Sequence, residues 1–173
     1  MALGISDSEI FKSIKVRTFT YALIAMFVSI LNVAILDSLS VGGMTPDFLL
    51  ILCVYISIAE GQFYGVVAGF CIGLFFDIVS FDLIGTNALA KTIAGFFAGY
   101  FYKEGFKSQT LGSLKLLFIV LFASLLNNAT YYLIFIKPME VNFWHFFTRY
   151  CIAMSLYTTI FSIFIMLIYY KRN

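Results

Sequence analysis

The fold is decided by one stretch of this chain, residues 61–77, which reads GQFYGVVAGFCIGLFFD. Small residues recur in it at every fourth position and a carboxylate follows them; the series is Gly61, Gly65, Gly69, Gly73 and Asp77. Four residues exceed one helical turn by only about 40°, so these positions share one slowly winding helix face. Glycines weaken a helix in water, but in a bilayer they let two helix backbones pack closely. The stretch predicts a membrane helix with a packing face that ends in a carboxylate.

The composition also places the chain in lipid. Of its 173 residues, 62% are hydrophobic and 12% are charged, about half the charged share of an average soluble domain. The basic residues are dispersed, so the net charge of +2 does not indicate a nucleic-acid partner. We therefore predict an all-α integral membrane protein with a single transmembrane domain over residues 1–173.

The apolar runs predict a bundle of six transmembrane helices. The expected spans are 18–36, 46–60, 62–79, 87–102, 111–136 and 143–170. The second run is short for a bilayer core of about 30 Å, so this span is either tucked among protein neighbours or re-entrant, with a hairpin turn near Glu60 and Gly61. The polar first 15 residues are compatible with a short helix on the membrane surface or with a frayed tail.

Lysine and arginine positions predict the orientation. An N-terminus inside the cell leaves only Lys137 and Arg149 on the outer side. The other boundary cations then lie on the cytoplasmic side; they are Lys12, Lys15, Arg17, Lys103, Lys107, Lys115, Lys171 and Arg172. This bias predicts that both termini are cytoplasmic.

No pattern for catalysis is present in the sequence. We find no nucleophile with a base, no pair of carboxylates and no metal-ligand spacing, so we expect no enzymatic activity, no cofactor and no metal. His145 stands beside Trp144 at a predicted membrane boundary, where an interfacial role is expected. The three cysteines lie in apolar runs and are expected to be buried small hydrophobes; they are Cys53, Cys71 and Cys151.

The fourth predicted span mirrors the third, because Asn87, Lys91, Gly95 and Gly99 again recur at every fourth residue. The two helices are expected to be antiparallel neighbours, with Gly73 meeting the Gly95 region. Asp77 and Lys91 would then lie at similar depth. We predict an ion pair or a water-bridged contact between them in the outer half of the bilayer.

The polar residues within the predicted spans leave two interpretations open. They are Asp77, Lys91, Asn127 and Asn128, with Arg149 as a further candidate. They could form a substrate or proton pathway, or they could fix the bundle through hydrogen bonds and one ion pair. The paired broken helices of transporters are not evident, which favours the second interpretation.

Three motifs in order resemble a known family. They are Pro46-Asp47-Phe48-Leu49-Leu50, then Gly69-x-x-x-Gly73-Leu74-x-x-Asp77, then Gly85. Together they are similar to the bacterial rod shape-determining protein MreD family. The resemblance implies a non-enzymatic inner-membrane scaffold of the cell-elongation and peptidoglycan-synthesis machinery. Its implied partners are an MreC-like protein, RodA with its class B penicillin-binding protein, MreB filaments indirectly, and membrane lipid.

The residues expected to carry structure or partner binding follow from these motifs and the two small-residue faces. They are Pro46, Asp47, Gly65, Gly69, Gly73, Asp77, Gly85, Lys91, Gly95 and Gly99. The expected fold also resembles the small six-span substrate-capturing components of vitamin transporters, and such a component of an energy-coupling-factor transporter is the alternative function. Members of that family share an Ala-x-x-x-Ala motif in the first span, whereas Ala22, Ala25 and Ala34 have other spacings here.

Overall fold

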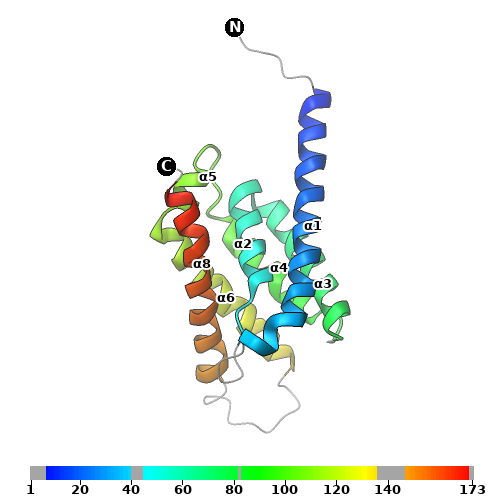
Figure 1. Cartoon of the computed structure of the whole chain (residues 1–173), viewed down its shortest axis with the longest axis vertical. Helices are drawn as coiled ribbons and strands as arrows, with labels where there is room; N and C mark the ends of the chain where they lie inside the picture. The colour runs from blue at the N-terminus through cyan, green and yellow to red at the C-terminus, as the bar shows by residue number, and fades with distance from the viewer. Residues whose placement is uncertain (1–6, 40–44, 82, 136–146, 172–173) are drawn as a thin grey trace.

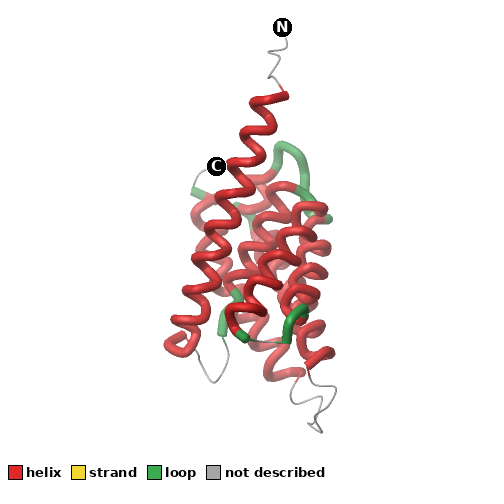
Figure 2. The backbone as a smooth tube through the Cα atoms, turned by 90° about the vertical axis from the view of Figure 1, so that its right-hand side faces the viewer, coloured by secondary structure: helices red, strands yellow, loops and turns green. Residues whose placement is uncertain are grey.

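The computed structural model describes residues 7–39, 45–81, 83–135 and 147–171. Within these ranges the protein is all-helical, which confirms the all-α part of the predicted fold class. The elements are α1 (Asp7–Leu39), α2 (Phe48–Glu60), α3 (Gln62–Ser80), α4 (Thr86–Gly99), α5 (Lys107–Leu111), α6 (Leu114–Phe135), the π-helical turn η1 (Phe147–Ile152) and α8 (Ala153–Tyr170). The longer helices lie side by side and alternate in direction, so α1 begins at the same end of the bundle where α8 ends (Figures 1 and 2).

Helix α1 is longer than the sequence predicts. It spans 33 residues, or about 50 Å at 1.5 Å per residue, and its first turns extend beyond the other helices (Figure 1). Neither a separate surface helix nor a frayed tail is found for residues 7–15, because this polar segment continues the helix of the following apolar run. Residues 1–6 lie outside the described ranges.

Helix α2 is short and lies among other helices. Asp47 caps its N-terminus, because its Oδ1 accepts a hydrogen bond of 2.8 Å from the backbone N–H of Leu50. The helix ends at Glu60, and Gly61 makes the turn into α3 with φ of 105°, a left-handed conformation that favours glycine. Eight of its 13 residues are buried. The predicted hairpin is confirmed. Of the two alternatives for this span, the structure shows a short helix packed among protein neighbours.

The core forms where α2, α4 and α6 meet. Ala94 and Ala98 of α4 are fully buried and pack with Val54 of α2 and Val120 of α6. Helix α4 has alanine on the side that faces α2 and α6 and glycine on the side that faces α3, so it has small residues on both packed sides. The bundle can therefore pack around it closely.

Helices α3 and α4 are in backbone contact through their glycines. A Cβ atom added at Gly69 would collide with the backbone carbonyl of Lys91, and one added at Gly73 would collide with backbone atoms of Asn87 and Ala88. Gly65 and Gly95 lie directly against each other. The antiparallel pairing predicted from the sequence is correct, but the predicted register is wrong, because Gly65 rather than Gly73 meets Gly95.

Other boundaries differ by a few residues from the predicted spans. Helix α4 ends at Gly99 rather than 102, and α6 begins at Leu114 rather than 111, after the separate short helix α5. The last helix starts with the π-helical turn η1, while residues 143–146, including Trp144 and His145, lie outside the described ranges.

Three described helices are long and apolar enough to cross a membrane. They are Gln62–Ser80, Leu114–Ile134 and Ala153–Tyr170; Phe48–Glu60 is apolar but shorter. These helices are those of a membrane protein. The six-span layout and the likeness to vitamin-transporter components stay predictions.

The glycine contact predicts a strong effect of added volume at Gly69. The neighbour there is backbone, which cannot rotate away, so Gly69→Val should force α3 from α4 at a cost of about 1–3 kcal/mol or more. The measurement is thermal unfolding of purified protein in detergent. Val67→Ile is the matched control, because Val67 is exposed on the same helix. Equal melting temperatures for both variants would contradict the close contact.

Candidate functional site: a buried polar cluster and its cavity

Asp77 caps a helix to which it does not belong. It lies in the last turn of α3 and is fully buried. Its Oδ2 accepts hydrogen bonds from the backbone N–H groups of Gly85 at 2.9 Å and Ala88 at 3.3 Å. Its Oδ1 accepts from Asn87, through the backbone N–H at 3.1 Å and the side-chain Nδ2 at 2.8 Å. Since the N-cap residue Gly85 has no side chain, Asp77 supplies the acceptor that the first turn of α4 needs.

Lys91 forms its ion pair with Asp47. Its ammonium Nζ lies 2.7 Å from Asp47 Oδ2, and the lysine side chain is only 1% exposed. The ring of Phe76 lies 5.6 Å from the same Nζ, a cation–π contact that adds to the stabilisation of the buried charge. This pair joins the start of α2 to the middle of α4.

The predicted ion pair between Asp77 and Lys91 is therefore wrong. Asn87 lies between them: its Nδ2 donates to Asp77, and its Oδ1 accepts from Lys91 Nζ at 3.4 Å. A carboxylate at the C-terminal end of its own helix is disfavoured by the dipole of that helix, so Asp77 needs positive charge nearby. The N-terminal end of α4 meets the same need, because its free N–H groups carry partial positive charge.

A polar cavity of about 230 Å³ adjoins these residues, at the end of the bundle where α2 and α4 begin. Helices α1, α3, α6 and α8 also contribute to it. The polar cavity is lined by Asn32, Thr45, Pro46, Asp47, Phe76, Asn87, Asn127, Asn128, Tyr131, Tyr132, Met154 and Thr158. Three asparagine side chains line the cavity from α1 and α6, namely Asn32, Asn127 and Asn128. Asp47 also lines it, so the ion pair with Lys91 lies at the cavity wall.

Two oxygen atoms of the polar cavity have no hydrogen-bond partner in the described structure. They are Oδ1 of Asn32 and Oδ1 of Asn127, whose residues are 4% and 3% exposed. The Nδ2 group of Asn127 is used, since it donates to Asn128 Oδ1 at 3.3 Å, and Asn128 in turn donates to Ser155 Oγ at 3.1 Å. A buried carbonyl oxygen without a donor costs about 1–3 kcal/mol. The cavity thus presents acceptors that suit a group rich in N–H or O–H donors.

The structure brings some of the sequence-predicted residues to this site. Pro46, Asp47 and Lys91 lie at or beside the cavity, and Asp77 and Gly85 meet at the adjoining start of α4. The glycines Gly65, Gly69, Gly95 and Gly99 lie instead along the contacts of α3 and α4. Arg149 belongs to η1, and its side chain is outside the described part of the structure.

Sequence reasoning missed Asn32 and Thr158. Thr158 Oγ1 accepts a hydrogen bond of 3.1 Å from the backbone N–H of Asp47, which ties α8 to the start of α2. Asn32 lies in the apolar run over residues 18–36. Its polarity within a predicted span is the signal that could have identified it.

The chemistry offered here is binding. The described residues hold no group of three His, Cys, Asp or Glu side chains that could bind a metal ion. Cys53 and Cys151 are buried as expected, but Cys71 is exposed on α3, which corrects the prediction for that residue.

Comparison with known proteins gives one family. The family model described as rod shape-determining protein MreD matches residues 12–172, nearly the whole chain. No curated protein and no solved structure matches.

The ion pair predicts an interaction between two substitutions. Lys91→Met should lower stability by about 3 kcal/mol, because it leaves the carboxylate of Asp47 without its cation. Adding Asp47→Asn should recover part of that loss, since asparagine can still cap α2. The measurement is a double-mutant cycle on thermal or denaturant unfolding in detergent. The comparison pairs Lys91→Met with Asp77→Asn, whose coupling energy should be smaller, because Asn87 lies between these two side chains. Recovery with Asp77→Asn and none with Asp47→Asn would restore the pairing predicted from the sequence.

Proposed function

The chain belongs to the MreD family of rod shape-determining proteins, and from this membership we propose that it is a non-enzymatic scaffold of the cell-elongation machinery in the bacterial cytoplasmic membrane. In this role it binds an MreC-like protein directly. Through that partner it associates with RodA, its class B penicillin-binding protein and, indirectly, the MreB filaments. Membership of this family implies a role in rod-shape determination.

The observation that carries the scaffold proposal is the pair of unpartnered acceptors in the polar cavity. Asn32 and Asn127 come from α1 and α6, two helices far apart in sequence. Both residues line the polar cavity, and each has a buried carbonyl oxygen without a partner among the described residues. A partner chain with free N–H or O–H groups would satisfy both. The resulting contact would be specific, because a partner without donors leaves these oxygens unpaired. We propose that a membrane-proximal polar segment of the MreC-like partner occupies this cavity.

The proposed layout in the membrane is one domain of six spans with both termini in the cytoplasm. Two features support it. The start of α1 and the end of α8 lie at one end of the bundle, opposite the polar cavity (Figure 1). The described cations Lys15, Arg17, Lys103 and Lys107 belong to segments at that same end. The polar cavity would then face the outer side of the membrane.

The scaffold proposal predicts a variant that is stable but inactive. Replacing Asn32 and Asn127 together by Leu removes two unpaired acceptors but also the Asn127 Nδ2 group that donates to Asn128 Oδ1. The gain and the loss should largely cancel, so the melting temperature should stay level. The same variant should fail to retain the MreC-like partner on co-purification. In rod-shaped cells depleted of the native protein it should leave the cells round or swollen.

Ser124→Ala is the matched control for this experiment. Ser124 Oγ is also buried without a partner among the described residues, but it does not line the polar cavity. This variant should gain stability and keep both partner binding and rod shape. Normal partner retention by the double asparagine variant would refute the cavity as the contact. Tight binding of a vitamin by the purified protein, with normal cell shape after deletion, would favour the transporter alternative.

The layout predicts which positions are reached from outside the cell. Single cysteines are placed at Gly4, Asp82, Phe106 and Glu140 in a background without the native cysteines. An impermeant thiol reagent applied to intact cells should label positions 82 and 140 only, because these connections join the outer ends of the spans. Labelling at 106 with protection at 82 would reverse the orientation.

A further inference from the structure

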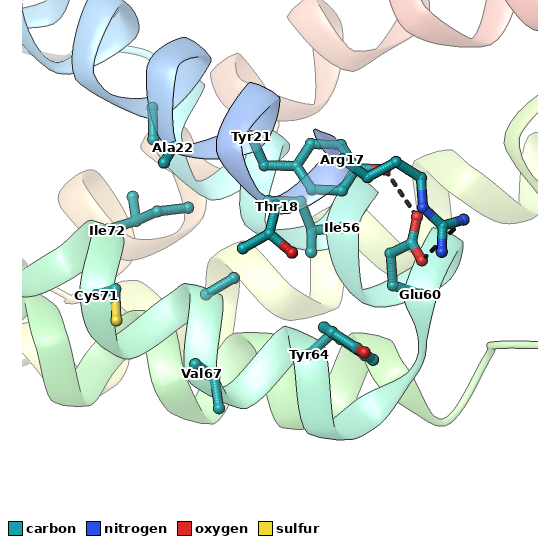
Figure 3. Close-up of a pocket in the computed structure, with 12 residues that line it drawn as sticks. Arg17, Thr18, Tyr21, Ala22, Ile56, Glu60, Tyr64, Val67, Cys71 and Ile72 are labelled. Carbon is teal, nitrogen blue, oxygen red and sulfur yellow. Dashed lines mark hydrogen bonds and ion pairs between the residues drawn. The ribbon is translucent and has the colours of Figure 1, made fainter. Parts of the chain in front are cut away.

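A second cavity of about 230 Å³ lies between α1 and α3 (Figure 3). Its polar residues lie near the end of α2, whereas the polar cavity lies where α2 begins. We call it the α1–α3 pocket. It is lined by Arg17, Thr18, Tyr21, Ala22, Ala25, Ile56, Glu60, Tyr64, Val67, Ala68, Cys71 and Ile72. Its wall is apolar except at one end, where Arg17, Tyr21 and Glu60 meet.

The two sides of α3 pack differently, and the α1–α3 pocket results from that difference. Towards α4 the glycines bring backbone against backbone. Towards α1 the contact is made by side chains such as Ala22 and Ala68, which are too short to fill the space between the helices. The outer wall includes the exposed residues Tyr64, Val67 and Cys71, so the pocket opens sideways, to the surface that faces lipid in a membrane.

The polar end of the pocket has a cation with spare donors. Arg17 NH1 lies 3.4 Å from Glu60 Oε2, and the hydroxyl of Tyr21 donates to Glu60 Oε1 at 2.9 Å. Glu60 is thus engaged at both oxygens and is 11% exposed, whereas the Arg17 side chain is 52% exposed. A guanidinium has five N–H donors in a planar fork, so Arg17 can still bind a phosphate from the outer side.

Arg17 also stands at a membrane boundary in the sequence. It is the last cation before the apolar run of α1, which begins at residue 18. Long basic side chains at this place reach the headgroup layer of a bilayer. The pocket therefore combines an apolar hollow, open to the acyl chains, with a cation at headgroup depth.

We propose that the α1–α3 pocket binds one anionic phospholipid, with an acyl chain in the apolar part and the phosphate on Arg17. A lipid matches both features of the pocket, because its acyl chain suits the apolar wall and its phosphate suits the spare donors of Arg17. Inorganic phosphate would not contact the apolar wall favourably, because it has no apolar surface to bury. The bound lipid fills the space that side chains leave, and it fixes α1 against α3.

Cys71 gives a direct reporter for this proposal. It lines the α1–α3 pocket and is exposed, whereas Cys53 and Cys151 are buried. The rate of its alkylation by N-ethylmaleimide, followed by peptide mass spectrometry, is compared in nanodiscs of phosphatidylcholine alone and of phosphatidylcholine mixed with phosphatidylglycerol. We expect about fivefold slower alkylation with phosphatidylglycerol, the advantage of one cation near an anionic headgroup.

Two variants distinguish specific lipid binding at Arg17 from general attraction of anionic lipid to the cations of the protein. Arg17→Gln should abolish the effect of phosphatidylglycerol. Lys103→Gln removes an exposed cation from a connection outside the pocket and should keep that effect. Native mass spectrometry of the unaltered protein should retain phosphatidylglycerol in preference to phosphatidylcholine.

Three results would overturn the proposal. Equal alkylation rates in the two lipid mixtures would mean that no anionic lipid protects the pocket. Equal loss of the effect in both variants would mean attraction by overall charge. Protection that grows with protein concentration in pure phosphatidylcholine would mean that a second copy of the chain covers the pocket instead.

Discussion

The bundle depends on the backbone contact between α3 and α4. Because a Cβ at Gly69 or Gly73 would collide with the backbone of α4, the two helices can approach this closely only because α3 has no side chain at these positions. This approach brings the last turn of α3 to the first turn of α4, and Asp77 reaches the N–H groups there. The glycines thus determine where a buried carboxylate is stabilised, although none of them touches it.

The same contact explains how three charged groups are accommodated close together, two of them buried (Asp77 and Lys91) and one partly exposed (Asp47). Asp77 is neutralised in part by the positive end of α4, so it does not compete for Lys91. Lys91 is then available to Asp47, which also caps α2. Helices α2, α3 and α4 are linked by this network through Asn87. Any other arrangement of these helices would leave a buried charge without its partner, which is strongly destabilising. The network therefore favours this arrangement over others.

The sequence could predict the features that depend on local pattern. Glycine at every fourth residue predicted the packing face, and Glu60-Gly61 predicted the hairpin, since both signals act within a few residues. The partner of Lys91 could not be predicted in the same way. Asp47 lies 44 residues away, and its approach depends on how α2 is rotated within the bundle. The start of α1 was missed for another reason, because a polar helix beyond the bundle lacks the apolar periodicity by which helices are recognised.

The two ends of the bundle have different packing defects. At one end Asn32 and Asn127 present acceptors that no described residue satisfies, and these cost stability without adding to the fold. At the other end the hollow between α1 and α3 forfeits contacts that larger side chains would make. Both defects would be relieved by molecules outside the chain, donors in the first case and an acyl chain in the second. In the proposed role of a scaffold with little of the chain outside the membrane, such places would be the sites of binding. Filling them with its own side chains would raise its stability and remove its means of recognition.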